Sequence, residues 1–242
     1  MALALERLFV ITVVRKILSY IKKVAWHVRH VAQVNVANKG KKMKWTSTIS
    51  PLIKEIELRK QPVIIRVNKF DEDSANKFQL EIAQAHNTGQ KVIPVIIDSY
   101  GGQVYSLMTM ISAIKHSEIP IATIVEGKAM SCGAVLLTFG EEGMRFADPD
   151  ATVMIHDVSS GGYGKVEELK ASSEEAGRLD DKIFTMMARN CGKKDDFFKK
   201  KVFNKKHADW FLDAQEAKKY GIVNHLRVPK FNINVSVDID FE

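Results

Sequence analysis

The segment Gly127-Lys128-Ala129-Met130-Ser131-Cys132-Gly133 follows the apolar run Ile121–Val125 and opens a second apolar stretch. This order predicts a strand, a turn of small residues and a helix, with Ser131 at the first turn of that helix. Two other apolar runs end in the same way, at Asp98-Ser99-Tyr100-Gly101-Gly102 and at Val153-Met154-Ile155-His156. Because ligands and catalytic groups collect at the carboxyl ends of strands in an α/β fold, these three segments predict one site.

Strand-like and helix-like segments alternate along the body of the chain. Strands are expected at residues 63–67, 92–97, 121–125, 153–155 and 222–226. Helices are expected at residues 71–86, 103–116, 131–139, 165–190 and 213–220. Repeated strand–helix units predict parallel strands joined by right-handed crossovers, and therefore the α/β class. Residues 235–242 alternate between apolar and polar, which predicts an added edge strand.

Composition narrows the class of protein. The 242 residues are 45% hydrophobic, which is typical of a soluble globular protein with a real core. Two cysteines, Cys132 and Cys191, predict no disulfide framework and favour a reducing compartment such as the cytoplasm. The histidines are scattered, and the spaced glycines of a nucleotide-binding fingerprint are missing, so we expect no metal and no cofactor.

The formal net charge of +7 comes from one end of the chain. Residues 1–45 contain ten Lys or Arg and a single acidic residue, whereas the remainder is slightly acidic, so no nucleic-acid partner is expected. Apolar residues at helical spacing predict a basic amphipathic helix there, followed by a linker over residues 35–50. The expected divisions are therefore 1–50, a main domain over 51–228, and a tail over 229–242.

The leader helix has three possible roles. Arg15 and Lys16 interrupt its apolar run too early for a membrane span. It can lie on an anionic membrane or a partner, serve as a targeting or pro-segment, or dock on its own oligomer.

Each site residue also has a structural alternative. Ser131 is a nucleophile or a helix N-cap, and His156 is a general base or a buried hydrogen-bonded histidine. Gly101 and Gly102 form a simple turn, or they direct an N–H group at an oxyanion. Spacing alone does not choose the carboxylate that would partner His156 among Asp148, Asp150, Asp157 and Asp209.

Taken together, these segments resemble the proteolytic subunit of Clp protease, including its phage relatives. That family carries Ser-Pro-Gly-Gly, then Gly-x-Ala-x-Ser-Met-Gly, then Met-Ile-His-Gln, where this chain has residues 99–102, 127–133 and 154–157. Further blocks match at residues 143–146, 161–164 and 209–223. The resemblance covers roughly residues 60–226, and several ordered blocks are a specific signal.

The resemblance implies a crotonase-like fold of repeated β-β-α/βα units, with residues 165–190 as a protruding handle helix. It implies a catalytic triad of Ser131 as nucleophile, His156 as base and Asp209 as the residue that orients the base. The remaining implied site residues are Gly102 and Cys132 for the oxyanion hole and Gly101, Gly161 and Gly162 for substrate binding. It also implies protein or peptide substrates, homo-oligomeric rings (a heptamer or a stacked double ring) that enclose the sites, and an AAA+ unfoldase as partner.

This chain departs from the family pattern at identifiable positions. Tyr100 replaces a proline, Cys132 replaces a methionine and Asp157 replaces a glutamine. The basic leader stands where the family has an axial loop. Three functions therefore stay open: a Clp-type serine endopeptidase, a phage-type head-maturation or scaffold-processing protease without an ATPase, and a catalytically silent ring-forming homologue.

Overall fold

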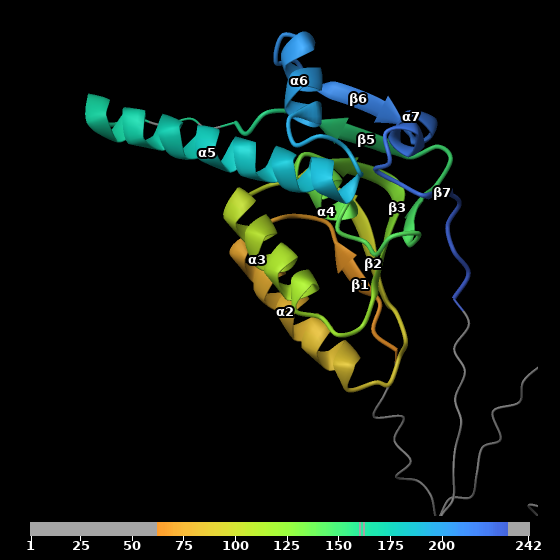
Figure 1. Ribbon diagram of the computed structural model, residues 1–242. Coiled ribbons are helices and arrows are strands. Elements are labelled where there is room, and N and C mark those ends of the chain that lie inside the picture. The colour runs from red at the N-terminus through yellow and green to blue at the C-terminus, as the bar shows by residue number, and fades with distance from the viewer. Residues whose placement is uncertain (1–61, 160, 162, 232–242) are drawn as a thin grey trace, which may run out of the picture. The chain divides into compact units, whose positions relative to one another are not determined.

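The computed structural model describes residues 62–159, 161 and 163–231 (Figure 1). The expected leader helix, linker and C-terminal edge strand, together with Gly162, lie outside the described residues. The strands are β1 (Ile65–Val67), β2 (Ile93–Ser99), β3 (Ile121–Met130), β4 (Arg145–Ala147), β5 (Thr152–Ile155), β6 (Trp210–Asp213) and β7 (His225–Leu226). The helices are α2 (Glu72–His86), α3 (Val104–Lys115), α4 (Cys132–Leu137), α5 (Val166–Asn190), α6 (Phe197–Asn204) and α7 (Ala214–Lys219).

The described strands form one sheet, which branches at β3. The main order is β1-β2-β3-β4-β7, while β5 pairs with β3 and β6 pairs with β5. The start of β3 pairs with β4 through residues 123–125, and its end pairs with β5 through residues 128–130. All of these pairings are parallel except β5–β6, which is antiparallel. The expected α/β class is confirmed, and the antiparallel pair of β5 and β6 was not predicted from the sequence.

Local sequence explains where α2 begins. The Asp71 carboxylate accepts a hydrogen bond from the Ser74 N–H at 2.8 Å, and the Asp71 N–H donates to the Ser74 hydroxyl at 2.9 Å. This reciprocal capping box satisfies amides that the first helical turn leaves unpaired. The buried face of the helix consists of Ala75, Phe78, Ile82 and Ala85. Helices α2 and α3 lie side by side next to β1 and β2 (Figure 1).

Helix α5 has two halves with different environments. Residues 166–174 are all exposed, and this half extends away from the sheet (Figure 1). The second half packs on the domain through Leu179, Asp180, Ile183, Phe184, Met187 and Ala188. The predicted long helix is therefore present as a protruding arm. It is the longest described helix, and neither it nor any other helix in this part of the chain is apolar enough over sufficient length to cross a membrane.

Candidate active site

Ser131 occupies the sharp turn between β3 and α4. Its backbone φ of 53° is unusual for a residue with a side chain, and it marks local strain that the surroundings must hold. The Ser131 N–H donates to the Met154 carbonyl of β5 at 2.9 Å, which ties the turn to the neighbouring strand. Its side chain makes no capping hydrogen bond to α4. Ser131 therefore occupies the N-cap position of α4 while its hydroxyl does not cap the helix, and a strained serine in a strand-turn-helix segment is the usual geometry of an exposed nucleophile.

The backbone of Gly101 and that of Gly102 each lie so close to neighbouring atoms that a side chain would not fit. Both have positive φ angles, 109° and 147°. A Cβ on Gly101 would lie 2.7 Å from the Ser131 Cβ, and a Cβ on Gly102 would lie 2.4 Å from the Phe70 carbonyl oxygen. Gly101 thus lets the loop after β2 lie directly against the serine turn, and Gly102 lets the same loop lie against the backbone of Phe70.

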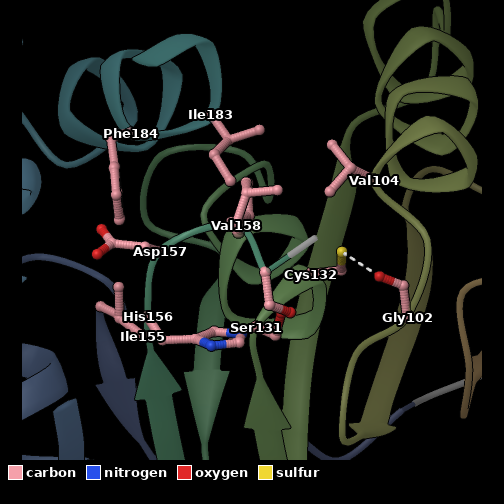
Figure 2. A pocket seen from close by; sticks show the side chains of 12 residues that line it. Gly102, Val104, Ser131, Cys132, Ile155, His156, Asp157, Val158, Ile183 and Phe184 are labelled. Carbon is pink, nitrogen blue, oxygen red and sulfur yellow. Dashed lines mark hydrogen bonds between the residues drawn. The ribbon is translucent and has the colours of Figure 1, made fainter. Parts of the chain in front are cut away.

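Two backbone amides border the serine. Among the described residues, neither the Gly102 N–H nor the Cys132 N–H donates to a backbone carbonyl outside regular elements. The Cys132 thiol donates to the Gly102 carbonyl at 3.3 Å, which joins the glycine loop to α4 (Figure 2). Burial raises the pKa of the Cys132 thiol to about 11, so the thiol is neutral near pH 7. Because the thiolate is the reactive form, Cys132 is not equipped to act as the nucleophile.

His156 follows the last residue of β5, and Asp209 precedes the first residue of β6. In the antiparallel pair Ile155 lies opposite Trp210, so the next position outward sets His156 opposite Asp209. The His156 Nδ1 lies 3.6 Å from the Asp209 Oδ1, which is ion-pair distance but longer than a good hydrogen bond. The side chain of Asp209 is 51% exposed, and that of His156 is 24% exposed.

The four carboxylates that spacing left open have different partners in the structure. Asp148 accepts a hydrogen bond from the Asp150 N–H at 2.9 Å, as in a tight turn, and Asp157 pairs with the imidazole of His207. Within the described residues, only Asp209 forms an ion pair with His156.

Ser131 and His156 line one pocket together with Gly102 and Cys132. In Figure 2 the imidazole of His156 points towards Ser131. No hydrogen bond joins the Ser131 hydroxyl to the imidazole in the described part of the chain, and such contacts commonly tighten only when substrate binds. The apolar part of the lining consists of Val104, Val135, Ile155, Val158, Ile183 and Phe184. The same lining also includes the polar side chains of Asp157 and Ser159.

The other expected substrate residues are placed differently. Gly101 abuts the serine turn, as described above. Gly161 is exposed, has open space where a side chain would stand, and is not part of the pocket lining. Gly162 lies outside the described residues, so a substrate-binding strand at 161–164 stays a prediction.

Sequence reasoning missed one residue that holds the segment after His156. Asp180 on α5 is 9% exposed, and its carboxylate accepts a hydrogen bond from the Val158 N–H at 2.9 Å. Burial, above all, raises the pKa of Asp180, although the Val158 hydrogen bond opposes that rise. An aspartate on the apolar face of an otherwise amphipathic helix was the available signal, because a buried carboxylate needs a partner. Through this bond α5 anchors the segment that carries His156.

Metal chemistry finds no support within the described residues, where no three His, Cys, Asp or Glu side chains gather as ligands.

Comparison with known proteins agrees with this architecture. The family model described as Clp protease matches residues 45–229. Two relatives, both named ATP-dependent Clp protease proteolytic subunit, come from two strains of Bacteroides fragilis. Each is 30% identical over 169 residues, which is 69% of this chain and 80% or 75% of the relative. These matches support a peptidase function and the crotonase-like fold. The extent of the family match, together with the identity to named relatives, shows that this chain belongs to the Clp protease family.

Proposed function

We propose that the chain is a serine endopeptidase of the Clp proteolytic-subunit type, acting on unfolded or partner-delivered proteins. The observation that carries the proposal is the alignment of the β3, β5 and β6 ends. It sets Ser131 and His156 on one pocket and Asp209 behind the imidazole, at 3.6 Å from Nδ1. A hydroxyl, an imidazole and an orienting carboxylate are the parts of a triad.

In this mechanism the Ser131 Oγ attacks the carbonyl carbon of the scissile peptide. His156 takes the hydroxyl proton on Nε2, because Nδ1 faces Asp209, and later returns that proton to the leaving amine. Asp209 holds the imidazole in this orientation and stabilises its protonated form. The amides of Gly102 and Cys132 receive the developing oxyanion, and water then releases the acyl group from Ser131.

Covalent labelling with a fluorophosphonate probe tests the triad. We expect the probe to label Ser131, and Ser131→Ala to abolish labelling. Asp209→Asn should slow labelling by about 10⁴-fold, the size of loss seen when a triad aspartate becomes asparagine. Asp150→Asn is the matched control, because this exposed carboxylate lies in the turn between β4 and β5, at the other end of β5 from His156, and it should label at the wild-type rate. Assembled wild-type protein that does not label would support the silent-homologue alternative instead.

The proposal includes assembly into rings that enclose the sites, and a reducing compartment in which Cys132 and Cys191 stay free, as they are in the structure. The two relatives carry "ATP-dependent" in their names, whereas the basic residues 1–45 favour a variant without an ATPase. Turnover of an unstructured protein by the purified chain without ATP and without an unfoldase would favour the phage-type processing enzyme. A strict requirement for both would reject it.

A further inference from the structure

Two histidine–carboxylate pairs join the segment after β5 to the segment before β6. In one pair the histidine comes from the first segment, and in the other it comes from the second. His156 after β5 faces Asp209 before β6, and the next residue, Asp157, binds the imidazole of His207. The first pair belongs to the proposed triad. The second has no role in that mechanism, and Asp157 is one of the positions where this chain departs from its family.

The turn before Asp209 has an unfavourable backbone. Lys206 and His207 both have a φ of 59°, in the left-handed region that residues with side chains seldom adopt. The His207 N–H bonds back to the Val202 carbonyl at 3.2 Å, and the Ala208 N–H bonds to the Lys205 carbonyl at 3.2 Å. The β5–β6 ladder therefore does not continue past Trp210, and a strained turn leads into Asp209.

Side-chain contacts of His207 hold this turn. Its Nδ1 binds the Asp157 carboxylate, and its ring packs edge-on against Phe203 of α6, with the ring centroids 5.4 Å apart. Two left-handed residues in sequence persist only when their surroundings fix them. Contacts on two sides of the imidazole meet that requirement.

The two halves of the Asp157–His207 pair are not equally anchored. Asp157 is followed by Val158, whose N–H is fixed to the nearly buried Asp180 of α5. By contrast, residues 203–209 are all exposed, so the turn depends on what it can bind. Asp157 is thus the fixed partner and His207 the one that is positioned.

Asp209 itself has little to orient it. Its side chain is half exposed, and its one ion-pair partner among the described residues is His156. The direction of its carboxylate therefore follows from its backbone, which is set by the β6 register on one side and by the turn at 205–208 on the other.

We propose that His207, held by Asp157, is a positioning residue that sets Asp209 against the imidazole of His156. This inference rests on the proposed serine peptidase mechanism. His207 does not line the pocket that Ser131 and His156 share, so its loss should act through Asp209 and change the rate constant of the chemical step rather than substrate affinity.

Substitutions at residues 206 and 207 separate the side-chain contact from the backbone. His207→Gly accepts the left-handed backbone but removes the contact, so kcat for a peptide substrate should fall about tenfold to a hundredfold, as for small misplacements of catalytic groups, with KM nearly unchanged. His207→Asn tolerates the same backbone and offers an amide donor near the position of Nδ1, so it should recover most of the loss. Lys206→Gly is the matched control, because it relaxes the neighbouring left-handed residue without touching Asp157, and it should keep wild-type kcat.

A double-mutant cycle with Asp209→Asn distinguishes positioning from a general effect on folding. If His207 acts through Asp209, His207→Gly should slow fluorophosphonate labelling in the wild type but cause no further slowing once Asp209 is replaced. Equal slowing in both backgrounds, wild-type kcat in His207→Gly, or equal loss in the Gly and Asn variants would overturn the proposal. A raised KM with unchanged kcat in Asp157→Asn would also overturn it, because it would place that carboxylate in substrate binding. Labelling that depends on Ser131 but not on His207 rejects this inference alone, whereas failure of Ser131 to label rejects the proposed function as well.

Discussion

Gly101 shows how the absence of a side chain shapes the site. An alanine there would combine a φ of 109° with a Cβ 2.7 Å from the Ser131 Cβ. The Ser131 backbone is already in an unusual conformation, so the turn cannot move aside at little cost. We predict that Gly101→Ala abolishes fluorophosphonate labelling of Ser131, because the serine or the oxyanion loop must shift.

The control for this variant is Gly89→Ala. Gly89 also has a positive φ, 74°, but a Cβ there meets nothing within 4 Å. Gly89→Ala should lose about 1–2 kcal/mol of unfolding free energy from the left-handed backbone, measured by urea denaturation, and Gly101→Ala should lose more because of the close contact. Only Gly101→Ala should lose labelling, and wild-type labelling in that variant would show that the close contact has no role in the site.

Most, but not all, of the candidate site could be predicted from the sequence. Ser131, His156 and Gly102 were predicted at strand ends, and the structure places all three on one pocket, together with Cys132, which the family resemblance implied. The ends of these strands can be predicted from the sequence because each one follows a short apolar run. Asp209 was singled out only by resemblance, since a carboxylate 53 positions after His156 meets it through a strand pairing that local pattern does not specify.

At the scale of elements, the long regular segments were predictable and the short irregular ones were not. The structure confirms α2, α3 and α5 nearly to the residue, because each shows apolar residues at helical spacing. It adds β4, α6 and β6, which were not predicted. Strand β4 is three residues long and contains the buried Arg145, α6 has no side-chain cap and three consecutive lysines, and β6 has only four residues. Tertiary pairing decides such segments more than propensity does.

The contact between α5 and the segment after His156 predicts a pH effect. Burial raises the pKa of Asp180 above its ordinary value of 3.8, with repulsion from Asp157 and Asp181 adding to the rise. The folded protein therefore binds this proton more tightly than the unfolded chain does. That contribution to stability is fully present below the unfolded pKa and is lost as pH increases through the folded pKa.

Asp180→Asn removes the titration but keeps an oxygen that can accept the Val158 hydrogen bond. We predict that the unfolding free energy of the variant, relative to the wild type, increases as pH rises from acidic to neutral. Urea denaturation of both proteins over this pH range measures the difference. Glu174→Gln removes an exposed negative charge from the outer half of α5 and controls for net charge. A difference that is independent of pH, or that decreases towards neutral pH, would contradict the assigned environment of Asp180.

At the scale of the whole molecule, the exposed half of α5 carries apolar side chains that the described part of the chain leaves uncovered. Val166 is 67% exposed and Leu169 is 40% exposed, and both lie on one side of the helix by its 3.6-residue period. An apolar stripe on a protruding helix is suited to packing against a second copy of the same helix. The family resemblance assigns this handle to contacts between two stacked rings.

We therefore predict that Val166→Asp combined with Leu169→Asp converts stacked rings into single rings. The two introduced carboxylates would have to be buried in the contact between rings, or brought close to those of the second copy. Burying a charge without an oppositely charged partner costs free energy. Native mass measurement of the full chain reports the change as a halving of the assembled mass. Ala171→Asp is the matched control, because Ala171 is exposed on the opposite side of the same helix and should leave the assembly intact. Stacked rings that persist in the double variant would place the contact between rings elsewhere than on this face of α5.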